Sequence, residues 1–225
     1  MGFSLRRFVL SVLSRQEAGV RQMDWKRLRF TYAQYGEDII AETLLPEARG
    51  FYVEIGAFHP VQISNTYLFY RKGWQGIAVD PHPRVAKLFR HRRPRDIMVQ
   101  CAVGEEGPAV FDILDAGESN HLRGSGVDSV SAKKPVRSIQ VQCRRLSSLL
   151  TEHLPAGQNI DFLTVDAEGH DLSVVRSNDW QKFRPRLVAV EDFAPEPESQ
   201  ICRFLAQQGY RLVITARFTR FFVTP

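Results

Sequence analysis

The sequence predicts an α/β fold with a mostly parallel, doubly wound sheet and an antiparallel hairpin strand at the C-terminal end. From residue 31 onwards, short apolar runs alternate with helix-like stretches, which is typical of a parallel sheet covered by helices. The first apolar run, Phe51–Ile55, ends at a glycine, and the next one ends at an acidic residue. With 225 residues, of which 44% are hydrophobic, the chain can bury one large core.

The first half of the domain is predicted to hold a βαβ unit and a further helix and strand. In chain order we expect a helix at 38–45, a strand at 51–55, a helix at 64–71, a strand at 76–79, a helix at 83–92 and a strand at 97–103. The strands are apolar runs bounded by turn residues. Ser64 or Asn65 can cap the second helix, because short polar side chains accept from free N–H groups at helix starts.

The second half is predicted to complete the sheet and to add a strand pair. The expected elements are strands at 108–114 and 138–143, a helix at 146–152, a strand at 162–165, a helix at 171–176, a strand at 187–190, a helix at 198–208, and a hairpin of 210–215 with 220–223. Between the added strands, residues 115–137 are rich in Gly, Ser and charge. So long a loop without secondary structure indicates a lid or substrate loop.

The positive charge of the chain belongs to its first 30 residues. The formal net charge is +5, and residues 1–30 hold seven basic and two acidic residues, so the remaining residues are formally neutral. We therefore divide the chain into a basic N-terminal segment, 1–30, and a domain, 31–225. The basic residues that follow the second strand are interpreted as a solvated helix face rather than a nucleic-acid site: Arg84, Lys87, Arg90, Arg92, Arg93 and Arg95.

The N-terminal segment is predicted to form a basic amphipathic helix. Leu5, Phe8, Val9, Val12 and Leu13 fall on one helical stripe with arginines beside it. We expect the stripe to pack on the domain or on a second subunit of a homo-oligomer, with peripheral binding to the inner face of a membrane as the alternative.

The three cysteines are widely spaced and suggest neither a disulfide framework nor a zinc site, so we expect a cytoplasmic protein.

Acidic residues follow the predicted strands at the positions where ligands bind in open α/β sheets. Such ligands lie beyond the carboxyl ends of the strands, where the strand order reverses. The residues at these ends are Glu54 and Gly56, Asp80, Asp166 and Glu168, and Glu191 and Asp192. The sequence therefore predicts an acid-rich binding site at one edge of the sheet.

The spacing of Gly56 and Asp80 indicates a nucleoside site without a pyrophosphate. A carboxylate 24 residues after the glycine turn can accept hydrogen bonds from both hydroxyls of a ribose. A dinucleotide would need G-x-G-x-x-G, but the turn GAFHP has one glycine, followed by Phe58 and Pro60. S-adenosylmethionine has no phosphate and carries a sulfonium cation, so an acidic rim suits it.

The sequence resembles the FkbM-type methyltransferases, which use S-adenosylmethionine and have a Rossmann-like methyltransferase fold. The matching segments are YAQYGED at 32–38, FYVEIGAFHP at 51–60 with SNT at 64–66, GWQGIAVDPHP at 73–83 and IDFLTVDAEGHDLSVV at 160–175. Their order is that of the family, and the D-x-E-G-x-[DE]-L box after a strand is the most specific part. The resemblance spans roughly residues 31–215.

The resemblance also implies cofactor-site residues. It places Glu54, Gly56 and Ala57 at the methionine end, Asp80 at the ribose and Cys101 with Ala102 at the adenine edge. It places Gln34, Asn65 and Asp166 near the cofactor or the acceptor. From the residues alone, several of these have a structural alternative: Asn65 can cap a helix, Cys101 can be core, and Gln34 can belong to a turn.

Methyl transfer to a hydroxyl needs a base, because an alcohol ionises far above neutral pH. His170 is one candidate, since histidine titrates near neutrality. Asp166, Glu168 and Glu191 are alternatives, since crowded carboxylates raise one another's pKa. Asp166, Glu191 and Asp192 could also hold Mg²⁺, which we do not favour, and no metal site is predicted.

The predicted function is O-methylation of a hydroxyl on a sugar or glycan intermediate. A polar loop at 115–137 suits a polar acceptor, and the resemblance implies O-methylation. The alternatives are O-methylation of a polyketide or other secondary metabolite, and a nucleoside-binding or scaffold domain without catalysis. We expect a small-molecule or glycan partner and no nucleic acid.

Overall fold

The computed structural model describes residues 29–114, 120–125, 134–195 and 198–224. The chain divides into two units, Met1–Phe30 and Thr31–Pro225, and all the elements given below belong to the second. The predicted amphipathic helix and parts of the predicted loop at 115–137 lie outside the described residues. None of the helices within the described ranges has the length and apolar character needed to cross a membrane.

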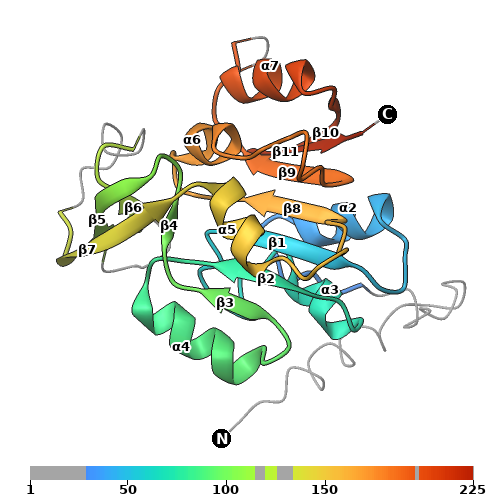
Figure 1. The fold of residues 1–225 in the computed structure, drawn as a ribbon. Coiled ribbons are helices and arrows are strands. Elements are labelled where there is room, and N and C mark those ends of the chain that lie inside the picture. The colour runs from blue at the N-terminus through green and yellow to red at the C-terminus, as the bar shows by residue number, and fades with distance from the viewer. Residues whose placement is uncertain (1–28, 115–119, 126–133, 196–197, 225) are drawn as a thin grey trace, which may run out of the picture. The chain divides into compact units, whose positions relative to one another are not determined.

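A seven-stranded sheet forms the centre of the domain, in the order β10-β11-β9-β8-β1-β2-β3 (Figure 1). Its strands are β1 (Phe51–Ile55), β2 (Gln75–Val79), β3 (Ile97–Val99), β8 (Phe162–Val165), β9 (Leu187–Glu191), β10 (Arg211–Ala216) and β11 (Thr219–Val223). Strands β3, β2, β1, β8 and β9 are parallel, whereas β11 pairs antiparallel with both β9 and β10. The predicted fold class, a mostly parallel sheet with an antiparallel strand from the C-terminal hairpin, is confirmed.

Helices cover both faces of this sheet (Figure 1). They are α2 (Glu37–Leu44), α3 (Tyr67–Arg71), α4 (Pro83–Arg92), α5 (Leu146–His153), α6 (Asp171–Arg176) and α7 (Gln200–Gln207). Alternate residues of β1 divide between the two layers: Val53 packs with the cores of α5, α6 and α7, and Tyr52 packs with those of α2 and α3. All five residues of β1 are buried, as expected of a central strand covered on both sides.

Two of the helices begin at residues that satisfy free backbone N–H groups. The Ser199 hydroxyl accepts from the Cys202 N–H at 2.9 Å and starts α7. The His82 imidazole accepts from the Arg84 N–H at 3.0 Å and starts α4, with Pro83 at a position that needs no donor. These caps fix where the loops after β2 and β9 turn into their helices.

Two element predictions need correction. The strand predicted at 97–103 is split, because after β3 the chain leaves the main sheet and Ala102–Val103 (β4) pairs with Arg144 and Cys143 in a second sheet. The helix predicted from residue 64 begins only at Tyr67. The residue before the helix is Thr66, not the predicted Ser64 or Asn65, although the Ser64 hydroxyl in the preceding turn accepts from the Tyr67 N–H at 3.1 Å.

The second sheet contains four strands in the order β4-β7-β5-β6. The predicted added pair corresponds to β5 (Gly107–Ile113) and β7 (Arg137–Arg144), which pair antiparallel. The loop predicted between them is partly structured, because His121–Leu122 forms β6 on the edge of β5. The Asp112 carboxylate accepts from Arg123 at 2.7 and 2.9 Å, which ties this part of the loop to β5.

Candidate active site

A cavity of about 270 Å³ lies at the carboxyl edge of the main sheet. Its walls include the residues that end β1, β2, β8 and β9, namely Gly56, Asp80, Asp166 and Glu191, together with Ala102 of β4. The strand order reverses between β1 and β8, so the cavity occupies the position where open α/β sheets bind their ligands. The predicted residues Gln34, Cys101, Glu168 and His170 also line it.

The turn after β1 accepts only glycine at position 56. Its φ is +80°, and a Cβ atom built on it would lie 1.7 Å from the Asp166 carbonyl oxygen. Backbone bonds from Gly56 and Ala57 to the Val79 carbonyl, at 3.0 and 3.1 Å, hold this turn against β2. The ends of β1, β2 and β8 therefore meet closely at the floor of the cavity.

Asp80 presents a fixed carboxylate to the cavity. It accepts from the Phe58 N–H at 2.9 Å and from the His82 N–H at 2.7 Å. Burial raises its pKa from 3.8 to about 6, so the group is mostly ionised above that pH. Each carboxylate oxygen has further lone-pair capacity, and the side chain can accept from the two vicinal hydroxyls of a ribose.

Asp166 and Glu191 form a carboxyl pair in the same cavity. Burial and the neighbouring acids Asp171 and Glu168 raise the pKa of Asp166, and burial with the charge of Asp166 raises that of Glu191 to about 10. The two side chains interact directly, and Glu191 Oε2 is buried with no hydrogen-bond partner among the described residues. Near neutral pH the pair therefore retains a proton that the two carboxyl groups share.

The loop from Asp166 to Asp171 is held by Asp171 itself. Its carboxylate accepts from the Ala167 N–H at 2.8 Å and from the Gly169 N–H at 3.0 Å. Glu168 adopts a φ of +50° in this turn. His170 follows on the wall of the cavity, where burial lowers its pKa and favours the neutral imidazole. The D-x-E-G-x-D segment of the sequence thus places the side chains of Asp166, Glu168 and His170 in the wall of one cavity.

The structure places Glu54 away from the cavity, which corrects its predicted role at the methionine end. Since side chains alternate along a strand, Glu54 faces the same side as Tyr52. Its carboxylate accepts from the Thr66 hydroxyl at 2.6 Å and lies 3.4 Å from the Arg93 guanidinium. Arg93 is fully buried and also contacts Asp96 at 2.6 Å. This arginine therefore does not belong to the solvated helix face predicted for the basic cluster.

We expect Glu54→Gln to lower the free energy of unfolding by about 2 kcal/mol, because it removes one charge of a buried pair while Asp96 still neutralises Arg93. Affinity for S-adenosylhomocysteine should change less than threefold. Urea denaturation and calorimetry measure the two quantities. Glu152→Gln, which breaks an exposed pair with Arg144, is the control and should leave stability nearly unchanged. A large loss of cofactor affinity in Glu54→Gln would instead support the predicted role of Glu54 in cofactor binding.

Two other predicted cofactor residues also lie outside the main cavity. Ala57 is buried in a small core with Ala78, Val85 and Phe89, so its side chain packs α4 instead of facing a ligand. The Asn65 amide donates to the Thr164 hydroxyl at 3.1 Å. It lines a small adjoining cavity of about 20 Å³ that shares Asp166 and Glu191 with the main one.

The carboxylates considered for Mg²⁺ do not converge. Asp192 lies 3.0 Å from Arg220 and accepts from the Ala194 N–H at 3.0 Å, so it is engaged away from Asp166 and Glu191. In the part of the chain that the structure describes, no group of three His, Cys, Asp or Glu side chains is arranged to hold a metal ion.

Several aromatic residues at the cavity could not be assigned from the sequence. Tyr35, Phe193 and Phe218 line it, with ring centroids 6.4 Å apart for Tyr35 and Phe218 and 4.8 Å apart for Phe193 and Phe218. Phe193 is 57% exposed, which is unusual for so large an apolar side chain beside an acidic site. The Arg217 guanidinium lies over the Tyr35 ring at 4.1 Å. The sequence offered one sign of a site position among these aromatic residues, which is that Phe193 directly follows Glu191 and Asp192.

Stability of the ligand-free protein should fall as pH rises from 5 to 7.5. Burial raises the pKa of Asp80 and of Asp171 from 3.8 to about 6, so the folded state binds their protons more tightly than the unfolded state does. The stabilisation is complete below pH 3.8 and is lost through pH 6. Asp80 and Asp171 should each contribute a decrease of about 1.4 kcal/mol in the free energy of unfolding, measured by urea denaturation. Asp80→Asn should show a shallower decrease, and a stability that rises over this range would contradict the assignment.

The chain matches one protein family over most of this site. Residues 54–212 match the Methyltransferase FkbM domain family. No curated protein matches the chain. Similar solved structures include a TehB-like SAM-dependent methyltransferase from Corynebacterium glutamicum, with a TM-score of 0.42 and 10% identity over 98% of this chain and 95% of that one. Another is an O-methyltransferase from Bacillus cereus in complex with SAH, with a TM-score of 0.43 and 10% identity over 97% of this chain and 90% of that one.

The family match covers the strand ends described above. It begins before Gly56, extends past Glu191 and includes Asp80 and the loop from Asp166 to Asp171. Since the matched residues make up more than half of its length, the chain belongs to the FkbM methyltransferase family.

Proposed function

We propose that this S-adenosylmethionine-dependent methyltransferase methylates a hydroxyl group on a sugar or glycan intermediate. The observation that carries the proposal is that one cavity brings together Asp80, the Asp166–Glu191 pair and an aromatic rim. Asp80 suits a ribose, the pair suits an acceptor that must lose a proton, and the rim suits an acceptor with an apolar face.

The residues of the cavity fit the cofactor. Gly56 lets the turn after β1 pack directly against the Asp166 backbone in the wall of the cavity, and Asp80 supplies two carboxylate oxygens at the end of β2. Cys101 and Ala102 are small residues on the same wall and can accept a flat base beside them. Bound S-adenosylmethionine would supply an electrophilic methyl group on a sulfonium.

The carboxyl pair can take the proton of the acceptor hydroxyl. Asp166 and Glu191 share a proton near neutral pH, so the pair keeps carboxylate oxygen that can accept a hydrogen bond from the acceptor hydroxyl. When the acceptor hydroxyl is methylated by the group that bound S-adenosylmethionine would supply, Asp166 would take the hydroxyl proton. The main contribution of the protein is alignment of the reacting atoms in a site with little water.

The rim supports a sugar acceptor over a purely apolar one. Tyr35, Phe193 and Phe218 offer flat faces to the C–H groups of a pyranose ring, while the carboxyls beside them accept from its hydroxyls. A hydrocarbon acceptor would leave buried carboxyl oxygens without partners, which is costly. This combination of acidic and aromatic groups is therefore best matched by a polyhydroxylated ring.

The proposal is tested by transfer of a labelled methyl group from S-adenosylmethionine to a panel of acceptors. The panel holds free sugars, sugar phosphates, nucleotide sugars and a phenolic polyketide. We expect label in a base-stable ether on a sugar ring. Label on the polyketide alone would establish the alternative acceptor class. Cofactor binding without transfer to any member of the panel or to crude glycan would favour a non-catalytic nucleoside-binding domain.

A further inference from the structure

A second cavity of about 290 Å³ lies next to His170. His170 lines both cavities. Gly104 keeps the chain after β4 close to this histidine, because a Cβ atom on Gly104 would lie 2.6 Å from the His170 Nε2 atom. The two cavities thus adjoin each other at His170.

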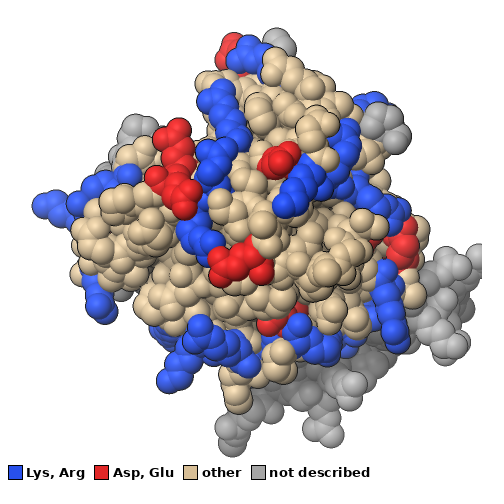
Figure 2. Space-filling model, viewed as in Figure 1, with Lys and Arg blue, Asp and Glu red and all other residues tan. Residues whose placement is uncertain are grey.

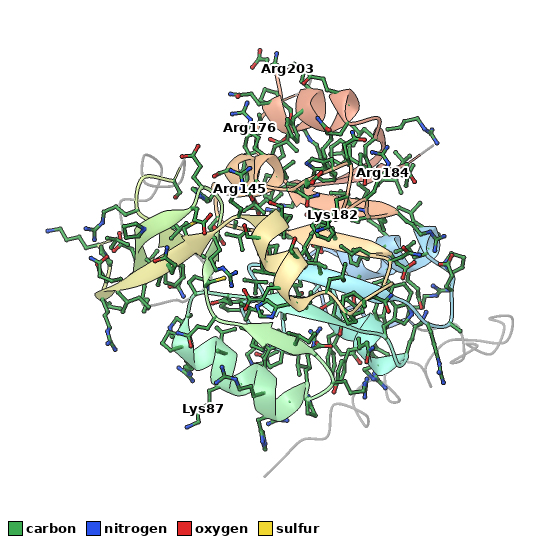
Figure 3. The ribbon with its side chains drawn as sticks, in the orientation of Figure 1. Lys87, Arg145, Arg176, Lys182, Arg184 and Arg203 are labelled. Carbon is green, nitrogen blue, oxygen red and sulfur yellow. The ribbon has the colours of Figure 1, made fainter. Side chains whose placement is uncertain are left out.

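Two arginines that have no acidic partner among the described residues line the second cavity. Arg145 directly precedes α5 and Arg176 ends α6, and Figure 3 shows both on the same face of the domain. The Arg176 guanidinium has one weak contact, 3.4 Å from the Gln200 side-chain oxygen. Neither arginine forms an ion pair within the described residues, unlike Arg144 and Arg186, which pair with Glu152 and Glu47. Their charges are available to a ligand.

A buried hydroxyl completes the donor set. Ser125 lines the cavity and is only 6% exposed, yet its hydroxyl has no hydrogen-bond partner among the described residues. An unpaired buried polar group is costly unless a ligand or solvent satisfies it. The Ser173 hydroxyl also lies in the wall of this cavity. Guanidinium and hydroxyl donors gathered in this way match an anion with several oxygens.

The surface around the second cavity also carries many basic side chains, with some acidic ones between them (Figure 2). Lys and Arg side chains gather around α5, α6 and α7 on the side seen in Figure 2, and Lys182, Arg184 and Arg203 lie on this face in Figure 3. One carboxylate, Glu105, lines the cavity and reduces its net charge. Two arginines against one glutamate still leave the cavity positive while His170 is neutral. Such a surface attracts an anion before it binds.

We propose that this second cavity binds the phosphate group of the acceptor, so that the substrate is a phosphorylated sugar rather than a free one. This inference rests on the proposed function, because it assigns a feature of the same acceptor. Arg145 and Arg176 hold the phosphate oxygens as charge-assisted donors, and Ser125 donates to a third oxygen. The sugar ring then lies toward His170 and the cofactor cavity.

The test measures phosphate binding directly, in the full chain saturated with S-adenosylhomocysteine. Inorganic phosphate and glucose 1-phosphate are titrated by phosphorus NMR. We expect Arg145→Gln and Arg176→Gln each to weaken binding of both probes about tenfold, and Ser125→Ala to weaken it about threefold. Glucose 1-phosphate should bind more tightly than inorganic phosphate, because its ring adds contacts.

Arg90→Gln is the matched control, because it removes the same charge from an exposed position of α4. It should leave phosphate binding unchanged. Equal affinity in the wild type and all variants would mean general attraction to a basic surface and would overturn the site, as would absence of phosphate binding. Glucose 1-phosphate no tighter than inorganic phosphate would overturn the assignment to the acceptor.

The failure of this inference can be told apart from the failure of the proposed function. S-adenosylhomocysteine affinity is measured in the same samples, and the three substitutions lie outside the cofactor cavity. If the cofactor product binds and phosphate does not, the second cavity is not an acceptor site while the methyltransferase site stands. If phosphate binding depends on the arginines but the cofactor product does not bind, the proposed cofactor site is wrong instead.

Discussion

Asp166→Asn should lower the rate of methyl transfer by a factor of about 10² to 10⁴, which is the contribution of a positioned general base. The amide cannot take a proton from the acceptor, and it also ends the proton sharing between Asp166 and Glu191. Affinity for S-adenosylhomocysteine should change less than tenfold, because Asp80 and the turn at Gly56 remain. Single-turnover kinetics with labelled cofactor separate this loss from a change in binding.

His170→Gln is the comparison that decides between the candidate bases. The imidazole lines the same cavity and is neutral near pH 7, so it also could accept a proton. If Asp166 is the base, this substitution should slow the reaction less than tenfold. A loss of activity in His170→Gln that exceeds the loss in Asp166→Asn would transfer the role to the histidine.

Asp80→Ala should weaken the binding of S-adenosylhomocysteine about 100-fold or more. The substitution removes two charge-assisted hydrogen bonds to a ribose, each contributing about 1.5 to 3 kcal/mol. It also frees the Phe58 and His82 N–H groups, which shape the wall of the cavity. Isothermal calorimetry at pH 7.5, where the carboxylate is ionised, measures the change.

The matched control is Asp179→Ala. Asp179 is an exposed carboxylate that also accepts from two backbone N–H groups, those of Gln181 and Lys182 at 3.1 and 3.2 Å. Its loss should leave cofactor binding unchanged, which separates a ligand contact from a general effect of removing a turn carboxylate. Equal weakening in both variants would mean that Asp80 is only a structural residue.

The main sheet and much of the cavity could be predicted from the sequence because their signals are local. Apolar runs marked the strands, and the residue after each strand marked the carboxyl edge, so Gly56, Asp80, Asp166 and Glu191 were predicted to lie together, as the structure has them. Local pattern could not show that β4 leaves the main sheet, since Ala102 and Val103 are as apolar as the strand before them.

The predictions for Glu54 and Arg93 were wrong for another reason. These residues form a buried ion pair although they are far apart in the sequence. Glu54 looked like a site acid and Arg93 like part of a solvated helix, yet each is buried against the other although they are 39 positions apart in the chain. The period of two along β1 places Glu54 on the face opposite to Val53 and Ile55, which was the available hint. The aromatic rim had no comparable signal, because Tyr35, Phe193 and Phe218 come from separate loops that meet only in the folded protein.

A crystal structure of the complex with S-adenosylhomocysteine tests the central claim most directly. We predict that the ribose hydroxyls lie within hydrogen-bond distance of Asp80 and that the base lies beside Cys101 and Ala102. The sulfur should point toward the Asp166–Glu191 pair, with open space between them for the acceptor. A complex in which the ligand lies elsewhere, or in which its sulfur points away from these carboxyls, would contradict the proposed site and the proposed role of Asp166.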